Sequence, residues 1–101
     1  MKLLVLTAVK SYEKEAVRLF KKAKISAFSN AEINGFKSDD HENLIDNWFS
    51  SSHENVKSIL FFTFAEEDNI NTLLEGLEEF NKNIESENPL RAVVLNIEKF
   101  L

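Results

Sequence analysis

The residues best suited to chemistry lie in one polar stretch, residues 37–55. It holds both histidines of the chain, His41 and His53, and carboxylates flank each of them. Imidazole and carboxylate groups together suit zinc, copper(II) or nickel, and negative local charge favours a divalent cation. The candidate metal ligands are therefore His41, His53, Asp39, Asp40 and Glu42.

The same stretch can be explained without a metal. One lysine and five carboxylates give it a net charge of −4, which is most of the −5 of the whole chain. The two histidines are 12 residues apart, a spacing that matches no established ligand motif. Solvated loop side chains are the simpler interpretation. Assembly of several copies could still combine ligands from neighbouring chains, so the metal hypothesis stays open.

Trp48 and Phe49 stand out in this polar stretch because they are large and aromatic. They either fold back onto the protein or are presented to a partner, since aromatic side chains dominate interaction hot spots. Both alternatives remain open from the sequence. Trp48 and Phe49 are therefore the candidate partner-binding residues.

The composition excludes several classes of function. A chain of 101 residues with 44% hydrophobic and 29% charged residues predicts one globular domain, residues 1–101. The absence of cysteine excludes disulfides and thiolate chemistry. The net charge of −5 argues against binding to nucleic acid or anionic lipid. No apolar run approaches the roughly 20 residues of a membrane helix, so we expect a cytoplasmic protein. No acid, base and nucleophile pattern predicts an enzyme.

The hydrophobic pattern predicts four strands and two amphipathic helices that must position these residues. The most apolar strand is Val56–Phe64, and its centre is apolar at successive positions. The other predicted strands are Lys2–Val9, a strand within Ile25–Phe36 that ends at Gly35, and Ala92–Ile97. Helices are predicted to begin after caps at Ser11 and at Asp68 or Asn69. This order is that of an α+β, ferredoxin-like βαββαβ sandwich, with a four-stranded antiparallel sheet and two helices on one face.

Three of these strands are apolar on both faces, namely Lys2–Val9, Val56–Phe64 and Ala92–Ile97. Two helices can cover only one face of a four-stranded sheet. The remaining apolar face is too large to be left in water. The pattern therefore predicts that a second copy covers this face in an oligomer. Thr7 and Lys10, at the end of the first strand, are placed where they could touch a ligand in a cleft between subunits.

One motif carries a resemblance to a known family. The stretch Asn30-Ala31-Glu32-Ile33-Asn34-Gly35-Phe36 resembles the nitrogen-regulatory PII family, whose second strand ends Glu-Val-x-Gly-Phe-Gly before a long loop. Gly35 and Phe36 are the residues that match. The resemblance implies a homotrimer with inward-facing sheets. It also implies a sensor that binds a small ligand or metal ion and signals through the 37–55 loop to a partner, such as a transport or metal-efflux system.

Two departures from that family bear on its ligand. The residue after Gly-Phe is Lys37 instead of glycine. The family's loop before the last strand is rich in glycine and lysine, but Ile84–Arg91 is acidic here, lacks glycine and keeps only Arg91 as a cation. We therefore do not expect ATP to bind in the PII manner. The alternatives are a metal-binding protein of the divalent-cation-tolerance type without a signalling partner, and a structural interaction module.

Overall fold

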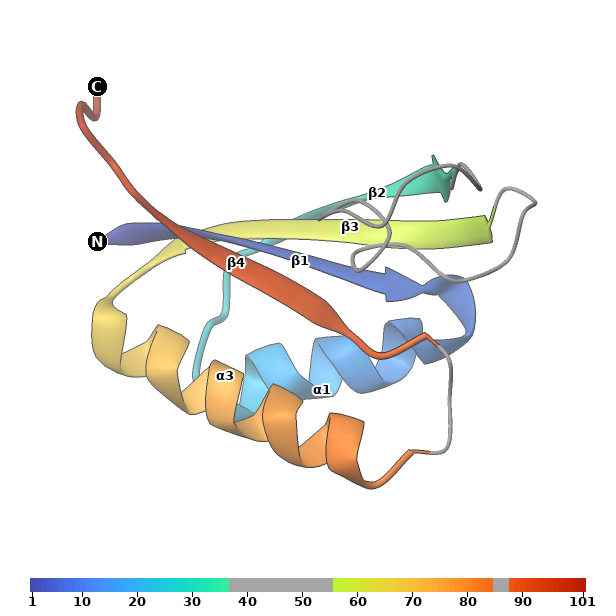
Figure 1. The fold of residues 1–101 in the computed structure, drawn as a ribbon. Helices are drawn as coiled ribbons and strands as arrows, with labels where there is room; N and C mark the ends of the chain where they lie inside the picture. The colour runs from blue at the N-terminus through green and yellow to red at the C-terminus, as the bar shows by residue number, and fades with distance from the viewer. Residues whose placement is uncertain (37–55, 85–87) are drawn as a thin grey trace, which may run out of the picture.

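The computed structural model describes residues 1–36, 56–84 and 88–101. In chain order its elements are β1 (Lys2–Val9), a 3-10 turn η1 (Lys10–Tyr12), α1 (Glu13–Lys22), β2 (Ser29–Gly35), β3 (Val56–Ala65), α3 (Glu67–Lys82) and β4 (Arg91–Asn96). The strands form one antiparallel sheet in the order β2-β3-β1-β4. Both helices pack against the same face of the sheet (Figure 1). The predicted ferredoxin-like α+β fold is confirmed.

The two central strands alternate between the faces of the sheet. In β1, Leu4 and Leu6 point toward the helices and are completely buried. Leu6 lies opposite Phe61 of β3, and Ala8 lies opposite Ile59. Directly opposed residues of an antiparallel pair share a face, so these side chains form one layer of the core. Buried side chains of the two helices pack against this layer and complete the core.

Phe20 of α1 is the centre of the helical side of the core. It is fully buried, and its ring stacks on Phe28 at a centroid distance of 4.4 Å. Phe61 of β3 lies 5.5 Å from the same ring. The predicted apolar stripe of α1 is confirmed, because Ala16 and Ala23 are also buried. The aromatic rings therefore join α1, the segment before β2 and the central strand.

The predicted helix caps are wrong. Ser11 lies in the 3-10 turn that continues directly from β1, and the residue at the cap of α1 is Tyr12, without a side-chain cap hydrogen bond. Glu66 occupies the cap of α3, also without a side-chain cap, so Asp68 already lies in the first turn. Asn69 serves a different purpose, since its Nδ2 donates a hydrogen bond to the carbonyl of Ala23 over 3.0 Å. This bond joins the end of α1 to the start of α3.

The second strand lies within the predicted stretch, at Ser29–Gly35. Ile25 is buried in the core instead of joining the sheet, and its N–H donates to the carbonyl of Phe20 at 3.0 Å. Lys24 has a φ of 59°, the left-handed conformation that often closes a helix. The predicted end of the strand at Gly35 is confirmed. The boundaries of β3 and β4 differ from the prediction by one residue, the usual uncertainty of strand ends.

The two helices approach closely at Gly76. A Cβ atom placed there would lie 3.1 Å from Cδ2 of Leu19, so a larger residue would press on α1. The predicted stripe of α3 is confirmed by Ile70, Leu73 and Leu77, which are buried.

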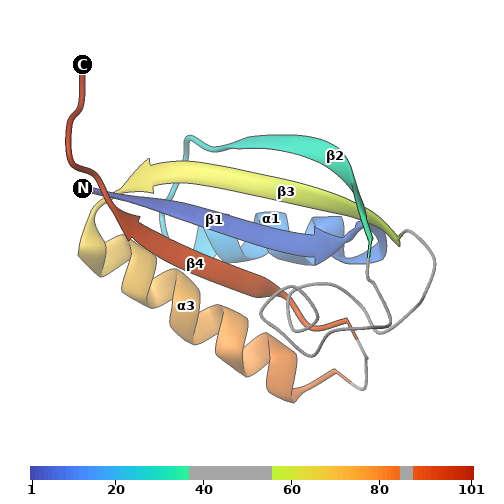
Figure 2. The ribbon, with the colours of Figure 1, turned by 45° about the horizontal axis from the view of Figure 1, so that its top comes forward.

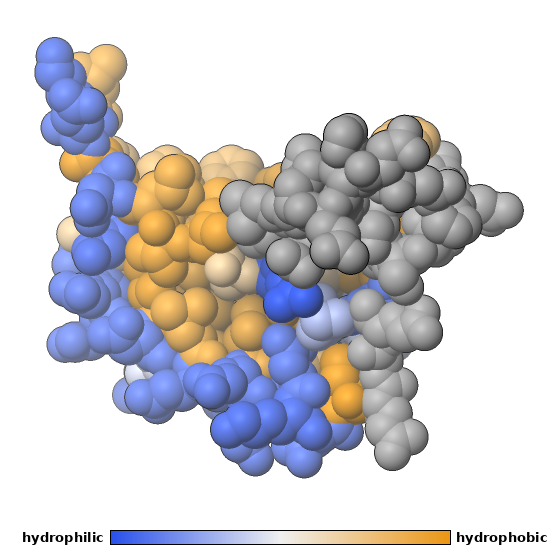
Figure 3. Space-filling model, viewed as in Figure 1, coloured by the Kyte–Doolittle hydropathy of each residue, from blue (hydrophilic) through white to orange (hydrophobic). Residues whose placement is uncertain are grey.

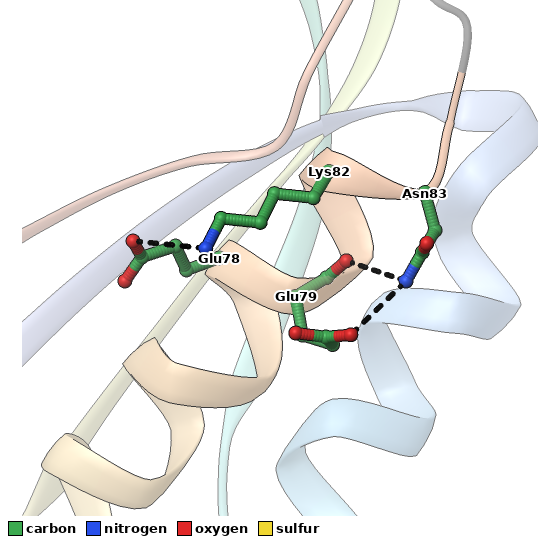
Figure 4. Close-up of polar contacts among 4 residues, drawn as sticks. All are labelled: Glu78, Glu79, Lys82 and Asn83. Atoms are coloured by element: carbon green, nitrogen blue, oxygen red, sulfur yellow. Dashed lines mark hydrogen bonds and ion pairs between the residues drawn. The ribbon is translucent and has the colours of Figure 1, made fainter.

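The last turn of α3 is closed by exposed polar contacts (Figure 4). Lys82 Nζ lies 3.9 Å from Glu78 Oε1. Asn83 Nδ2 donates to the carbonyl oxygen of Glu79 at 3.0 Å and to its Oε1 at 3.3 Å. Exposed pairs of this kind contribute little free energy, so they finish the helix instead of forming a site.

The face of the sheet turned away from the helices, here called the open face, is apolar, and several of its side chains remain partly exposed. Its residues in β1, β3 and β4 include Leu3, Val5, Leu60, Phe62, Phe64, Val93 and Leu95. Phe62, Phe64, Val93 and Leu95 remain 39%, 45%, 42% and 46% exposed. Seen edge-on from the β4 side, the surface has an apolar area over β4 and the neighbouring edge of the sheet, flanked by hydrophilic residues (Figure 3). The predicted two-sided apolar strands are therefore confirmed.

Candidate functional site

A polar cleft of about 290 Å³ lies at the edge of the sheet, beside the end of β2 and the start of β3. It is lined by Lys10, Glu32, Ile33, Asn34, Lys57 and Ser58. Asn34 near the end of β2 lies directly opposite Lys57 near the start of β3. The cleft therefore sits at the base of the 37–55 segment.

Three elements bring charged groups into this cleft. Lys10 follows directly after β1. Glu32 comes from the edge strand β2, and Lys57 comes from β3. Within β2 and β3, Glu32 and Lys57 belong to the set of alternate positions that point toward the helix side, as the register with buried Ile59 shows. The cleft thus depends on strand pairing between residues that are far apart in sequence.

Glu32 is the carboxylate between two ammonium groups. Lys10 Nζ donates a hydrogen bond to Glu32 Oε1 and forms an ion pair with it. This hydrogen bond and the charge of Lys10, followed by a smaller contribution from the charge of Lys57, lower the pKa of Glu32. The same hydrogen bond and the charge of Glu32 raise the pKa of Lys10. With two lysines and one glutamate, the cleft carries one excess positive charge at neutral pH and suits a small anion.

The two residues predicted from their position to touch a ligand, Lys10 and Thr7, lie in different surroundings. Lys10 lines the cleft. Thr7 does not, because it is buried between its partners Leu60 and Arg91 in the layer of the open face. Sequence reasoning missed Lys57 and its neighbour Ser58 as site residues. The available signal was the pair of polar residues that begins an otherwise apolar strand.

The other sequence-predicted site residues cannot be placed. Residues 37–55 lie outside the described residues and include the candidate metal ligands and aromatics, His41, His53, Asp39, Asp40, Glu42, Trp48 and Phe49. Among the residues that the structure does describe, no group of three or more histidine, aspartate or glutamate side chains could hold a metal ion. Of the motif residues, Gly35 is buried at the end of β2 and Phe36 is exposed just beyond it.

The approach to β4 is held by a side chain. Asn81 of α3 donates from Nδ2 to the carbonyl of Leu90, and its Oδ1 accepts from the N–H of Leu90, both over 2.9 Å. Leu90 is buried, so this clasp fixes the chain before Arg91. Arg91 itself is exposed and points to the open face, opposite Thr7. Within residues 1–36, 56–84 and 88–101, no helix is long and apolar enough to cross a membrane.

Comparison with known proteins finds likeness at the level of structure. No family model matches the sequence, and no curated protein matches it. Solved structures of CPII, a nitrogen regulatory PII-like protein from Thiomonas intermedia K12, do match. Its complex with ADP, AMP and bicarbonate is 15% identical, with a TM-score of 0.63 over 99% of this chain and 94% of that chain.

Two further structures of that protein agree. Its complex with ADP, AMP and acetate is 15% identical, with a TM-score of 0.61 over 95% of this chain and 84% of that one. Its apo form is 17% identical, with a TM-score of 0.59 over 92% and 84%. Identities this low establish likeness of fold alone. The chain therefore has the fold of the nitrogen regulatory PII-like proteins, with a sequence that is only 15–17% identical to CPII.

Proposed function

We propose that this protein is a PII-like regulatory sensor in the cytoplasm. It assembles as a homotrimer, binds a small ligand, and signals to a partner protein, such as a transport or metal-efflux system, through residues 37–55. The observation that carries this proposal is the position of the cleft. Asn34 and Lys57 line it, and they are paired residues of the two strands from which the 37–55 segment departs. A ligand in the cleft would therefore touch both of the strands that flank the segment that would signal.

The cleft chemistry favours a small anion. Lys10 and Lys57 supply two cations, and Glu32 accepts a hydrogen bond from Lys10. An incoming carboxylate or bicarbonate would compete with Glu32 for Lys10 and change the contacts of β2. CPII has been solved with bicarbonate and with acetate, as well as with ADP and AMP. A volume of about 290 Å³ is at the lower end of small-molecule sites, which suits a small anion better than a whole nucleotide.

The open face supports the homotrimer. In a single chain its four largest exposed side chains, Phe62, Phe64, Val93 and Leu95, stay about two-fifths exposed. Exposed apolar surface of this kind marks an interface, and a cyclic assembly covers the same face on every copy. Packing the open faces together would leave the clefts at the sheet edge available to ligand.

Calorimetry tests the ligand assignment. The purified chain is titrated with bicarbonate, acetate, ADP, AMP and ATP, and we expect binding of a small anion that is lost in Lys57→Met. Lys22→Met, which removes an exposed lysine of α1 outside the cleft, is the matched control and keeps the binding. If Lys57→Met and Lys22→Met bind all anions as the wild type does, the cleft is not the ligand site.

Metal binding without a signalling partner is the second candidate, because the two histidines lie among carboxylates in the sequence. It predicts zinc or copper(II) binding that disappears in the double variant His41→Ala, His53→Ala. If the wild type and the double variant give the same heat on titration with zinc or copper(II), this metal-binding hypothesis is refuted. The signalling proposal instead predicts capture of a partner that depends on Trp48, and a Trp48→Ala protein that captures the same partner equally well would contradict it.

A further inference from the structure

The segment that follows β4, residues 97–101 and here called the arm, lies outside the hydrophobic core of its own chain. It leaves the sheet after Asn96, the partner of Lys2 at the start of β1. From there it rises on the side of the sheet opposite the helices (Figures 1 and 2). Phe100 on the arm is 67% exposed, and Leu101 is fully exposed. Large apolar side chains held this far from a core lose the free energy that burial would supply.

The arm continues the open face. The ring of Phe100 meets the ring of Phe64 edge to face, with centroids 5.8 Å apart. Phe64 in turn meets Phe62 edge to face at 6.3 Å. These three rings form one row from β3 to the arm. The contact with Phe64 nevertheless leaves two-thirds of Phe100 exposed, so the chain's own face does not bury the arm.

The face and the arm are chemically matched. Among the side chains of β1–β4 that the register places on the open face, Arg91 alone is charged. The arm offers two apolar side chains to such a surface. Five extended residues span at most about 17 Å, while neighbouring strands are about 4.8 Å apart. The arm is therefore long enough to cross several strands of a sheet packed against its own.

We propose that the arm of each copy packs across the open face of a neighbouring copy, where Phe100 and Leu101 become buried. This inference rests on the proposed assembly and adds to it the segment that links the subunits. In a cyclic arrangement each copy gives one arm and receives one, so every open face is closed in the same way. The arm extends the interface beyond the flat sheet surface.

The first test removes the apolar groups of the arm. Sedimentation velocity over a concentration series compares wild type with the double variant Phe100→Ser, Leu101→Ser. Loss of the two buried side chains lowers the affinity of each contact by about tenfold or more, which raises the midpoint concentration of a trimer by about thirtyfold or more. Glu98→Ser on the same arm is the control and leaves the midpoint unchanged. An unchanged midpoint in the double variant refutes the proposed packing of the arm but not the proposed trimer. A wild type that stays a single chain refutes both proposals.

The second test locates the arm directly. The chain has no cysteine, so Lys99→Cys carries a single nitroxide spin label. Labelled copies are mixed with ¹⁵N-labelled wild type below the assembly midpoint and concentrated together. We expect broadening of the amide signals of Leu3, Phe62 and Phe64 in the ¹⁵N copies, which lack the nitroxide. If the mixed assembly forms and those signals stay sharp, the arm does not reach its neighbour.

Discussion

Replacing Phe62 with serine should break the proposed trimer while leaving the fold of the chain intact. Phe62 is 39% exposed in the single chain, which is about 80 Å² of a side chain of about 200 Å². Burial of that area contributes about 2 kcal/mol per subunit. A trimer loses this contribution three times, about 6 kcal/mol in all, and its midpoint concentration should rise about a hundredfold. The helix-side neighbour Phe61 keeps the core closed.

Analytical ultracentrifugation measures that midpoint, and circular dichroism confirms that the secondary structure is retained. Phe62→Leu is the matched control, because it keeps an apolar side chain at the same place and should assemble within a few-fold of wild type. The reasoning about the open face is refuted if Phe62→Ser assembles at the wild-type concentration. It is also refuted if the wild type sediments as a single chain at every concentration tested.

Three further substitutions test the core, the clasp before β4 and the cleft. Phe20→Ala should cost about 3–5 kcal/mol in urea unfolding, because it empties the stacked site beside Phe28; a loss below 1 kcal/mol would contradict that packing. Asn81→Ala should cost about 2–3 kcal/mol, since the buried N–H and C=O of Leu90 both lose their partner; Asn83→Ala on the exposed side is its control. Lys10→Met should return the pKa of Glu32 upward toward its ordinary value of 4.5, as followed by carboxyl carbon NMR. Because the pKa of Glu32 is lowered and that of Lys10 is raised, the stabilisation from the pair holds at neutral pH. It is lost in acid, as the pH falls through the folded pKa of Glu32, and in alkali, as the pH rises through the folded pKa of Lys10; a carboxyl titration that is the same with and without Lys10 would contradict the pairing.

The strand pattern was predictable because its physics is local. Side chains in a strand alternate between the two faces of a sheet. Apolar residues at successive positions in β1 and β3 therefore place apolar side chains on both faces. The structure confirms this at Leu6 and Phe61 on one side and at Phe62 on the other. The amphipathic stripes of α1 and α3 were predictable for the same reason, since a helix needs only one apolar side against the sheet.

The residues at which the helices and strands begin, and the residues that meet in the cleft, depend on tertiary contacts. No local sequence pattern encodes those contacts. Ser11 is a favourable cap residue, but the chain turns through η1 before α1 begins. Ile25 fits a strand by type, but the core buries it beside α1. The cleft joins Lys10, Glu32 and Lys57 from three elements, and only the register between β2 and β3 makes them neighbours.

The central strand β3 connects the two surfaces on which the proposed function depends. Lys57 turns one way into the cleft, and Phe62 turns the other way onto the open face. Assembly that fixes β3 should therefore alter the cleft, and a ligand in the cleft should alter assembly by the same factor, because coupling between two binding equilibria is reciprocal. The measurement is the assembly midpoint with and without saturating bicarbonate, set against bicarbonate affinity in wild type and in Phe62→Ser. A bicarbonate affinity that is identical in the assembled protein and in the single chain would mean that β3 does not couple the cleft to the open face.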